Sequence, residues 1–176
     1  MRTRTVLLAA AVILALAAGA QAADKLSGVT RIRPLNPGAA ALLADAQQKS
    51  ETVRNLVKSL EDGDVVAYVQ LVPANASGPQ STLQFVGASH TVRFVLIQVA
   101  DCEKPCRKAE LLGHELQHVN EVLVATWITD DSAMQRMLKM TGYPDSSSAR
   151  GYETAAAGQT ERKVRHDVGA IVGSAQ

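Results

Sequence analysis

The stretch that decides the fold is Leu111–His118, which reads Leu-Leu-Gly-His-Glu-Leu-Gln-His. It lies in the middle of a predicted helix that runs from Lys108 to about Trp127. Apolar residues recur along this helix with helical spacing, so one face is expected to pack against a core. These residues are Leu112, Leu116, Val119 and Leu123. The histidines and the glutamate lie outside this stripe, which predicts a separate site face.

The site face carries the motif H-E-x-x-H, formed by His114, Glu115 and His118. Two histidines four positions apart on a helix project from one face roughly 6 Å apart, which suits two imidazoles on one zinc ion. A glutamate directly after the first histidine can take a proton from a metal-bound water. The alternative is a surface helix with two hydrogen-bonded histidines and a solvated glutamate.

This run resembles the zinc helix of the zincin metallopeptidases. The downstream Tyr152-Glu153-Thr154-Ala155-Ala156-Ala157 resembles the helix that supplies the third zinc ligand, a glutamate, in the gluzincin branch. The resemblance covers roughly Val65 to His166. It implies a compact, minigluzincin-like domain in which an edge strand borders the cleft and zinc lies between two helices.

The third zinc ligand is the open question at this level. The resemblance implies Glu153, while Glu121 and His166 are the alternatives. Glu121 shares the histidine face but lies one helical turn further along, so it is expected either to contact a ligand of the ion or to act as an acid in the cleft. The metzincin pattern is excluded, because Glu121 and Val124 occupy the positions that would need glycine and histidine.

The segments around the motif predict an α+β fold with a small antiparallel sheet packed with helices, zincin-like in its active-site zinc helix. The period of the apolar residues indicates helices and strands in turn. The expected helices are Ala39–Leu60, a short one from Asp131 or Ser132 to Lys139, and Tyr152 to about Ile171. The expected strands are Val65–Val72, Leu83–Val86 and Thr91–Val99.

The first 22 residues read as a secretory signal peptide. Arg2 and Arg4 precede an apolar run, and Ala20-Gln21-Ala22 is a typical cleavage site. Residues 23–176 are then expected to form one exported domain, periplasmic or secreted. In an oxidising compartment Cys102 and Cys106 are expected to form a disulfide that pins one turn.

The composition excludes some classes of partner. Lys and Arg number 18 against 17 Asp and Glu, without the basic excess typical of nucleic-acid-binding proteins. After signal cleavage no further segment approaches the apolar length that spans a bilayer, so no stable membrane insertion is expected. The sequence gives no indication of oligomeric state.

The sequence therefore predicts an exported zinc-dependent peptidase. His114, His118 and Glu153 would bind zinc, and Glu115 would act as the base on a metal-activated water that hydrolyses a peptide or protein substrate. The alternative is a non-catalytic exported protein that keeps the zinc helix to bind zinc or a partner.

Overall fold

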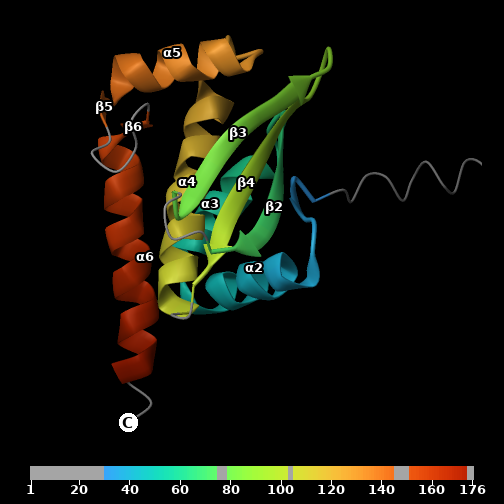
Figure 1. Cartoon of the computed structure of the whole chain (residues 1–176). Coiled ribbons are helices and arrows are strands. Elements are labelled where there is room, and N and C mark those ends of the chain that lie inside the picture. Colours follow the sequence, from blue (N-terminus) through green and yellow to red (C-terminus); the bar gives the residue numbers. More distant parts are fainter. Residues whose placement is uncertain (1–29, 75–78, 103–104, 145–150, 174–176) are drawn as a thin grey trace, which may run out of the picture. The chain divides into compact units, whose positions relative to one another are not determined.

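A four-stranded sheet forms the centre of the fold, with the spatial order β1-β2-β4-β3 (Figure 1). The computed structural model describes residues 30–74, 79–102, 105–144 and 151–173. The strands of this sheet are β1 (Ile32–Pro34), β2 (Val65–Pro73), β3 (Ser81–Ala88) and β4 (Arg93–Asp101). A separate two-stranded ribbon pairs β5 (Tyr143–Pro144) with β6 (Tyr152–Glu153).

Five helices in the described part of the chain pack with the sheet, so the mixed α+β class is confirmed. They are α2 (Pro37–Lys49), α3 (Glu51–Leu60), α4 (Pro105–Val124), α5 (Asp131–Thr141) and α6 (Ala155–Gly173). None of the helices in these described ranges combines the length and the apolar character needed to cross a bilayer. The expected signal peptide and the side chain of Cys106 lie outside the described residues, so cleavage and the disulfide stay predictions.

The sheet is mostly parallel, which corrects the predicted antiparallel sheet. Strand β2 pairs in parallel with both β1 and β4, and only β3 is antiparallel to its neighbour. Strands β1 and β2 are parallel because α2 and α3 carry the chain back over the sheet between them. Strands β2 and β4 are parallel because β3, which lies between them in the chain, runs in the opposite direction at the edge of the sheet. Strand β1 has three residues and ends at Pro34, so its sequence carried no strand pattern.

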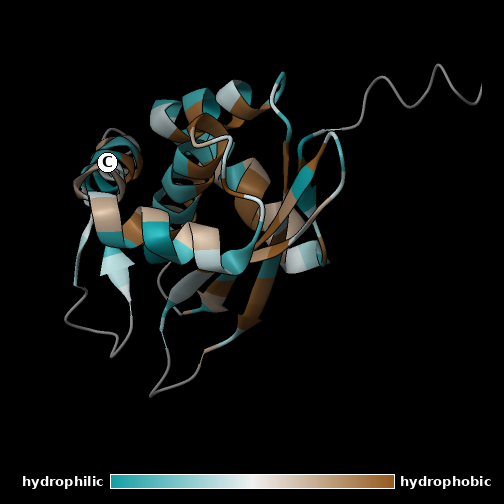
Figure 2. Cartoon of the chain, turned by 90° about the horizontal axis from the view of Figure 1, so that it is seen from above, coloured by the Kyte–Doolittle hydropathy of each residue, from teal (hydrophilic) through white to brown (hydrophobic). Residues whose placement is uncertain are grey.

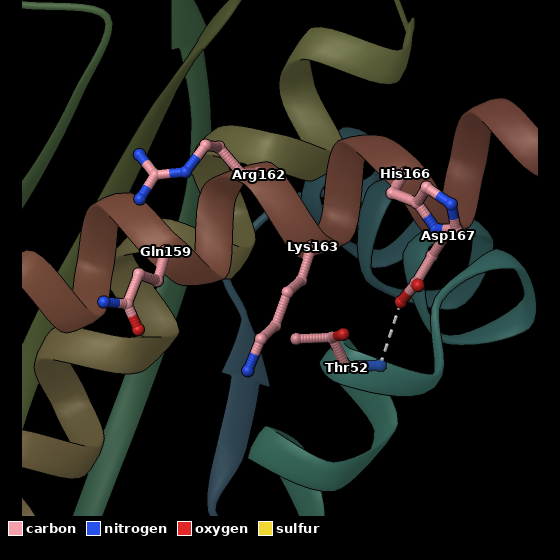
Figure 3. Close-up of a pocket in the computed structure, with 6 residues that line it drawn as sticks. All are labelled: Thr52, Gln159, Arg162, Lys163, His166 and Asp167. Carbon is pink, nitrogen blue, oxygen red and sulfur yellow. Dashed lines mark hydrogen bonds between the residues drawn. The ribbon is translucent and has the colours of Figure 1, made fainter.

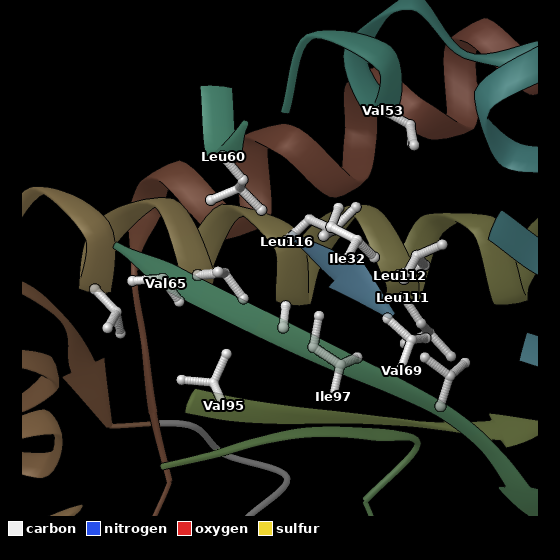
Figure 4. Packing of buried hydrophobic residues seen from close by; sticks show 14 of the residues in the cluster. Ile32, Val53, Leu60, Val65, Val69, Val95, Ile97, Leu111, Leu112 and Leu116 are labelled. Atoms are coloured by element: carbon white, nitrogen blue, oxygen red, sulfur yellow. The ribbon is translucent and has the colours of Figure 1, made fainter. Parts of the chain in front are cut away.

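One face of the sheet packs against the helices to form the core. Ile97 of β4 lies opposite Val69 on one side and Leu83 on the other, so these side chains form a row across that face. Leu112 and Leu116 of α4 are fully buried against it, as the apolar stripe predicts (Figure 4). In Figure 2 the inner strands are predominantly brown, in keeping with this burial.

The predicted helix over 39–60 is two helices that meet at Ser50. Ser50 ends α2 and also caps α3, because its Oγ accepts a hydrogen bond from the Val53 amide. Asp167 of α6 accepts from both the Ser50 hydroxyl and the Thr52 amide. The N-terminus of α3 is therefore satisfied by two side chains and tied to α6.

A buried arginine fixes the position of α4 on the sheet. Arg93, the first residue of β4, is 3% exposed and donates to the carbonyls of Val122, Leu123 and Ala125 at the end of α4. Asp64 accepts two hydrogen bonds from the same guanidinium. A helix C-terminus favours a cation and leaves carbonyls that need donors, so Arg93 caps α4 and holds its site face in place.

Candidate metal centre

Helix α4 presents His114 and His118 on one face, as the four-residue spacing predicts. Their rings lie 4.9 Å apart between centroids and meet edge to face. Both histidines are buried, because they lie on the part of α4 that faces Glu153 and helix α6. Their Nε2 atoms both lie near the carboxylate of one residue, Glu153.

Glu153 completes a group of three side chains that could hold a metal ion. Its Oε2 lies 2.9 Å from His114 Nε2 and 3.6 Å from His118 Nε2. The ligand atoms of the three residues all lie within 4.8 Å of one another. Among the described residues, this is the one group of at least three His, Cys, Asp or Glu side chains that meets that distance.

Glu153 does not belong to a helix, which corrects the predicted start of the last helix at Tyr152. It lies in β6, where Tyr143 and Pro144 pair with Glu153 and Tyr152. Helix α6 begins at Ala155, and Thr154 caps it by accepting a hydrogen bond from the Ala157 amide. The carboxylate therefore approaches the histidines from a strand at the entry to α6.

Glu121 contacts the opposite side of His118 from Glu153. Its Oε2 lies 2.8 Å from His118 Nδ1, and its Oε1 accepts a hydrogen bond of 2.6 Å from Thr154 Oγ1. A carboxylate on Nδ1 places the ring proton there and leaves the lone pair of Nε2 free for a metal. Glu121 thus orients His118 and links it to the residue that follows Glu153.

Glu161 has a similar but looser relation to His114, and no sequence pattern around the motif pointed to it. Its Oε2 lies 3.4 Å from His114 Nδ1. Arg107 and Arg165 form ion pairs with Glu161 and also with the buried Glu110. Spacings of three and four residues could have suggested the pairs within each helix, Arg107–Glu110 and Glu161–Arg165. The pairs that cross between the helices, and the approach of Glu161 to His114, depend on how α4 and α6 pack.

Two buried polar atoms in this group have no hydrogen bond within the described residues: His114 Nδ1 and Glu153 Oε2. Glu153 Oε2 is close to both imidazoles, but it is not aligned with an N–H of either ring. A buried carboxylate oxygen without a donor is costly. A cation held jointly by Glu153 and the two Nε2 atoms would satisfy it, so the residues present fit a metal ion.

The charges in the cluster are strongly coupled. Burial would raise the pKa of Glu153, but the facing His114 and His118 outweigh it and lower the pKa to about 2. Burial would lower the pKa of His118, but Glu121 and Glu153 outweigh it and raise the pKa to about 10. The pKa of His114 is also raised, because Glu153 and Glu115 outweigh its burial. The carboxylates of this group therefore favour positive charge on the two histidines or on a cation bound between them.

Glu115 lies beside the cluster and belongs to a different environment. It is 4% exposed, and burial raises its pKa, while the two histidines and a hydrogen bond from Ser81 act in the opposite direction. A carboxyl group with a raised pKa can accept and return a proton near neutral pH. The helix therefore presents two metal-type donors and one acid–base group on adjacent faces.

The cluster lies between two cavities that form one cleft along the start of β3. The larger, about 430 Å³, is lined by His114, Glu115 and Glu153 together with Arg107 and Tyr143. The smaller, about 170 Å³, extends towards α5. Both cavities are lined by four shared residues: Pro79, Ser81, Glu115 and Glu153. Glu115 is thus accessible from the cleft despite its burial.

His166, an alternative ligand in the sequence analysis, does not join the cluster. It is exposed on α6 and lines another cavity of about 450 Å³ with Lys163 and Asp167 (Figure 3). This cavity shares no lining residue with the cleft. The hydrogen bond drawn there is the one from the Thr52 amide to Asp167, which caps α3.

Comparison of the chain with protein-family models, with curated proteins and with solved structures finds no match.

Proposed function

We propose that this chain is an exported zinc-dependent peptidase-like protein, similar to the gluzincin branch of the zincins. The observation that carries the proposal is the buried Glu115 beside His114, His118 and Glu153, in a cleft next to an edge strand. Two histidines and one carboxylate form a donor set that is typical of catalytic zinc sites. When bound, zinc would supply Lewis acidity that polarises a carbonyl and acidifies water.

The side chains of the chain have distinct roles in this proposal. Glu115 accepts a proton from a water molecule in the cleft, holds it on its carboxylate and returns it to the leaving amine. Its burial and raised pKa support this role. Glu121 keeps His118 in the tautomer that binds a metal. The free edge of β3 offers backbone groups to an extended peptide.

The second candidate is a non-catalytic exported protein that retains the helix to bind zinc or a partner. A purely structural zinc site is closed on all sides and has no use for a base. The cavities on both sides of Glu115 favour the enzyme over this alternative.

Hydrolysis by the zinc-loaded protein tests the proposal. A library of fluorogenic peptides should be cleaved by the wild-type chain and not by Glu115→Gln, which keeps zinc because Glu115 is not a ligand. The matched control is Glu51→Gln on the exposed start of α3, which should cleave as wild type does. One zinc per chain without cleavage of any peptide would favour the non-catalytic alternative.

Export is proposed from the sequence alone. Mass spectrometry of the protein recovered from outside the cytoplasm should give a chain that begins at Ala23, and an intact Met1 there would contradict it.

Titration of thiols under denaturing, non-reducing conditions should find none, because Cys102 and Cys106 are proposed to be bonded.

A further inference from the structure

We propose that the face of the central sheet that points away from the helices is the interface of a symmetric dimer of this chain. This outer face is formed by side chains of β1, β2 and β4: Arg33, Tyr68, Gln70, Phe94, Leu96 and Gln98. None of them lines the cleft, so the inference is independent of the proposed function.

The alternation of side chains along the strands places these residues on one side of the sheet. On β4 every second residue from Val95 to Val99 is fully buried on the helix side, so Leu96 points the other way. Leu96 lies opposite Tyr68 of β2, which lies opposite Arg33 of β1. The guanidinium carbon of Arg33 is 5.9 Å from the centre of the Tyr68 ring, so both side chains lie on the outer face.

No helix in the described part of the chain covers the outer face. Helices α2 and α4 contact the strands from the opposite side, and in Figure 1 β2 and β4 lie in front of α3 and α4 with no helix in front of them. Three neighbouring strands, β1, β2 and β4, are parallel, and parallel sheets are nearly always covered on both faces. The outer face therefore lacks the second layer that a sheet of this type normally has.

The outer face has the composition of an interface centre. Tyr68, Phe94 and Leu96 are only partly buried, and none of them belongs to the hydrophobic core or packs against it. The rings of Tyr68 and Phe94 stack with 6.4 Å between their centroids. Arg33 is the one charged side chain that β1 to β4 direct to this face. The centres of protein interfaces are likewise poor in charge and rich in aromatic residues and arginine.

A second copy of the chain is the partner that this face fits. The amide of Gln98 donates a hydrogen bond of 3.2 Å to that of Gln70, so the polar groups partly satisfy each other and can be buried at low cost. No carboxylate lies on the face, and its single arginine lies over an aromatic ring, so no charge pattern selects an unlike partner. A twofold axis would bring the same apolar patch against itself, as in most homodimers.

The size of the face also fits a dimer. Strands β2 and β4 have nine residues each, which at about 3.3 Å per residue and about 4.8 Å between strands makes the four-stranded face roughly 19 Å by 30 Å. Because β1 is short, this is about 500 Å² per copy and about 1,000 Å² for both, near the lower limit of a specific interface. The dimer should therefore be weak, with a Kd on the order of 10 µM.

Sedimentation velocity between about 1 and 500 µM tests the dimer, since the wild-type chain should pass from monomer to dimer over this range. Leu96→Glu places a charge at the centre of the face in both copies and should weaken dimerisation by about a hundredfold or more. The control is Met140→Glu, at a residue of α5 that is 78% exposed, which should dimerise as wild type does. A wild-type chain that stays monomeric at the highest concentration overturns the proposal, as does full dimerisation of Leu96→Glu.

A second variant decides the matter if circular dichroism shows that Leu96→Glu is unfolded. Gln84 is exposed on β3 directly opposite Leu96, so Gln84→Lys should leave the fold intact and weaken dimerisation by about tenfold. Dimerisation of Gln84→Lys as strong as that of the wild type overturns the proposal.

Oxidation by hydroxyl radicals locates the interface. Tyr68 and Phe94 should be oxidised severalfold more slowly at concentrations where the dimer forms. Tyr143 is 53% exposed and lines the cleft, so it should be oxidised equally at all concentrations. A dimer in which Tyr68 stays as reactive as in the monomer uses another face and overturns the assignment.

Discussion

Glu153 and Glu121 both contact His118, but through different ring nitrogens. Glu153 faces Nε2, where it converges with His114, while Glu121 hydrogen-bonds at Nδ1. An imidazole binds a metal through one nitrogen and is oriented through the other. The structure therefore separates a candidate ligand from an orienting residue, which the sequence spacing left open.

The zinc affinities of the two alanine variants should differ accordingly. Glu153→Ala removes a donor and should abolish stoichiometric zinc binding. Glu121→Ala leaves all three donors but frees His118 to rotate, so the affinity should fall by about tenfold. Competition with a chromogenic chelator measures both. If Glu121→Ala loses the metal while Glu153→Ala keeps it, the ligand assignment is wrong.

Zinc binding should become stronger as the pH rises. The pKa of His118 is raised to about 10, so its imidazole carries a proton at neutral pH unless a metal displaces it. Zinc needs the neutral ring, so the affinity should increase by about tenfold per pH unit for each proton displaced, up to about pH 10. Calorimetric titrations at pH 7 in buffers of different ionisation enthalpy count the released protons.

The stability of the chelator-treated protein should show the opposite trend. A raised pKa of His118 stabilises the fold fully below its unfolded value of 6.5, and this contribution is lost as the pH rises towards about 10. Chemical denaturation across this range measures it. His166→Gln, a change at an exposed histidine, should alter neither trend. Zinc affinity independent of pH between 6 and 9 would contradict both expectations.

At the level of elements, the sequence predicted those helices and strands whose apolar residues recur with a regular period. Helix α4 and strand β4 follow from apolar spacing, since both bury one regular face. Strand β6 has two residues and exists only because β5 lies beside it, so Glu153 was assigned to the helix that follows. Ser50 marks the division locally by capping α3 at the Val53 amide, but its second partner, Asp167, lies more than a hundred residues away and no local pattern contains it.

Gly113 sets the distance between α4 and α6 beside His114. A Cβ at this position would lie 2.6 Å from Cγ2 of the fully buried Val164. Valine is stiff at χ1 and cannot turn away easily, so the helices would have to separate. Gly113→Ala should cost about 1 kcal/mol despite the higher helix propensity of alanine, and it should weaken zinc by moving His114 relative to Glu153.

A glycine in α6 provides the control for this prediction. A Cβ at Gly169 would meet nothing within 4 Å, so Gly169→Ala should stabilise the fold by about 0.5–1 kcal/mol through helix propensity. The double variant Gly113→Ala, Val164→Ala should recover zinc affinity, because the contact is relieved. Thermal denaturation and zinc competition report the two effects. Unchanged zinc affinity in Gly113→Ala would show that close packing here does not position the site.

Across residues Arg31–Gln176, the candidate ligands join two parts of the chain that are far apart in sequence. His114 and His118 belong to α4, which Arg93 anchors to the sheet, while Glu153 precedes α6, which packs along α4. The segment between α4 and Glu153 contains α5 and, after it, residues 145–150. Only residues 145–150 of this segment are not described. A metal ion held by all three side chains would therefore act as a cross-link between α4 and the entry to α6.

Zinc should accordingly stabilise the whole fold. At a free zinc concentration 100 times the dissociation constant, the gain is about 2.7 kcal/mol, which corresponds to a rise in Tm of about 5–10 °C for a domain of this size. Amide exchange should slow most at the start of α6, because Glu153 immediately precedes its cap. Calorimetric melting with and without a chelator measures the shift. The Tm of His114→Ala should be the same with and without the chelator. A zinc-dependent rise in Tm that persists in this variant would place the metal elsewhere in the chain.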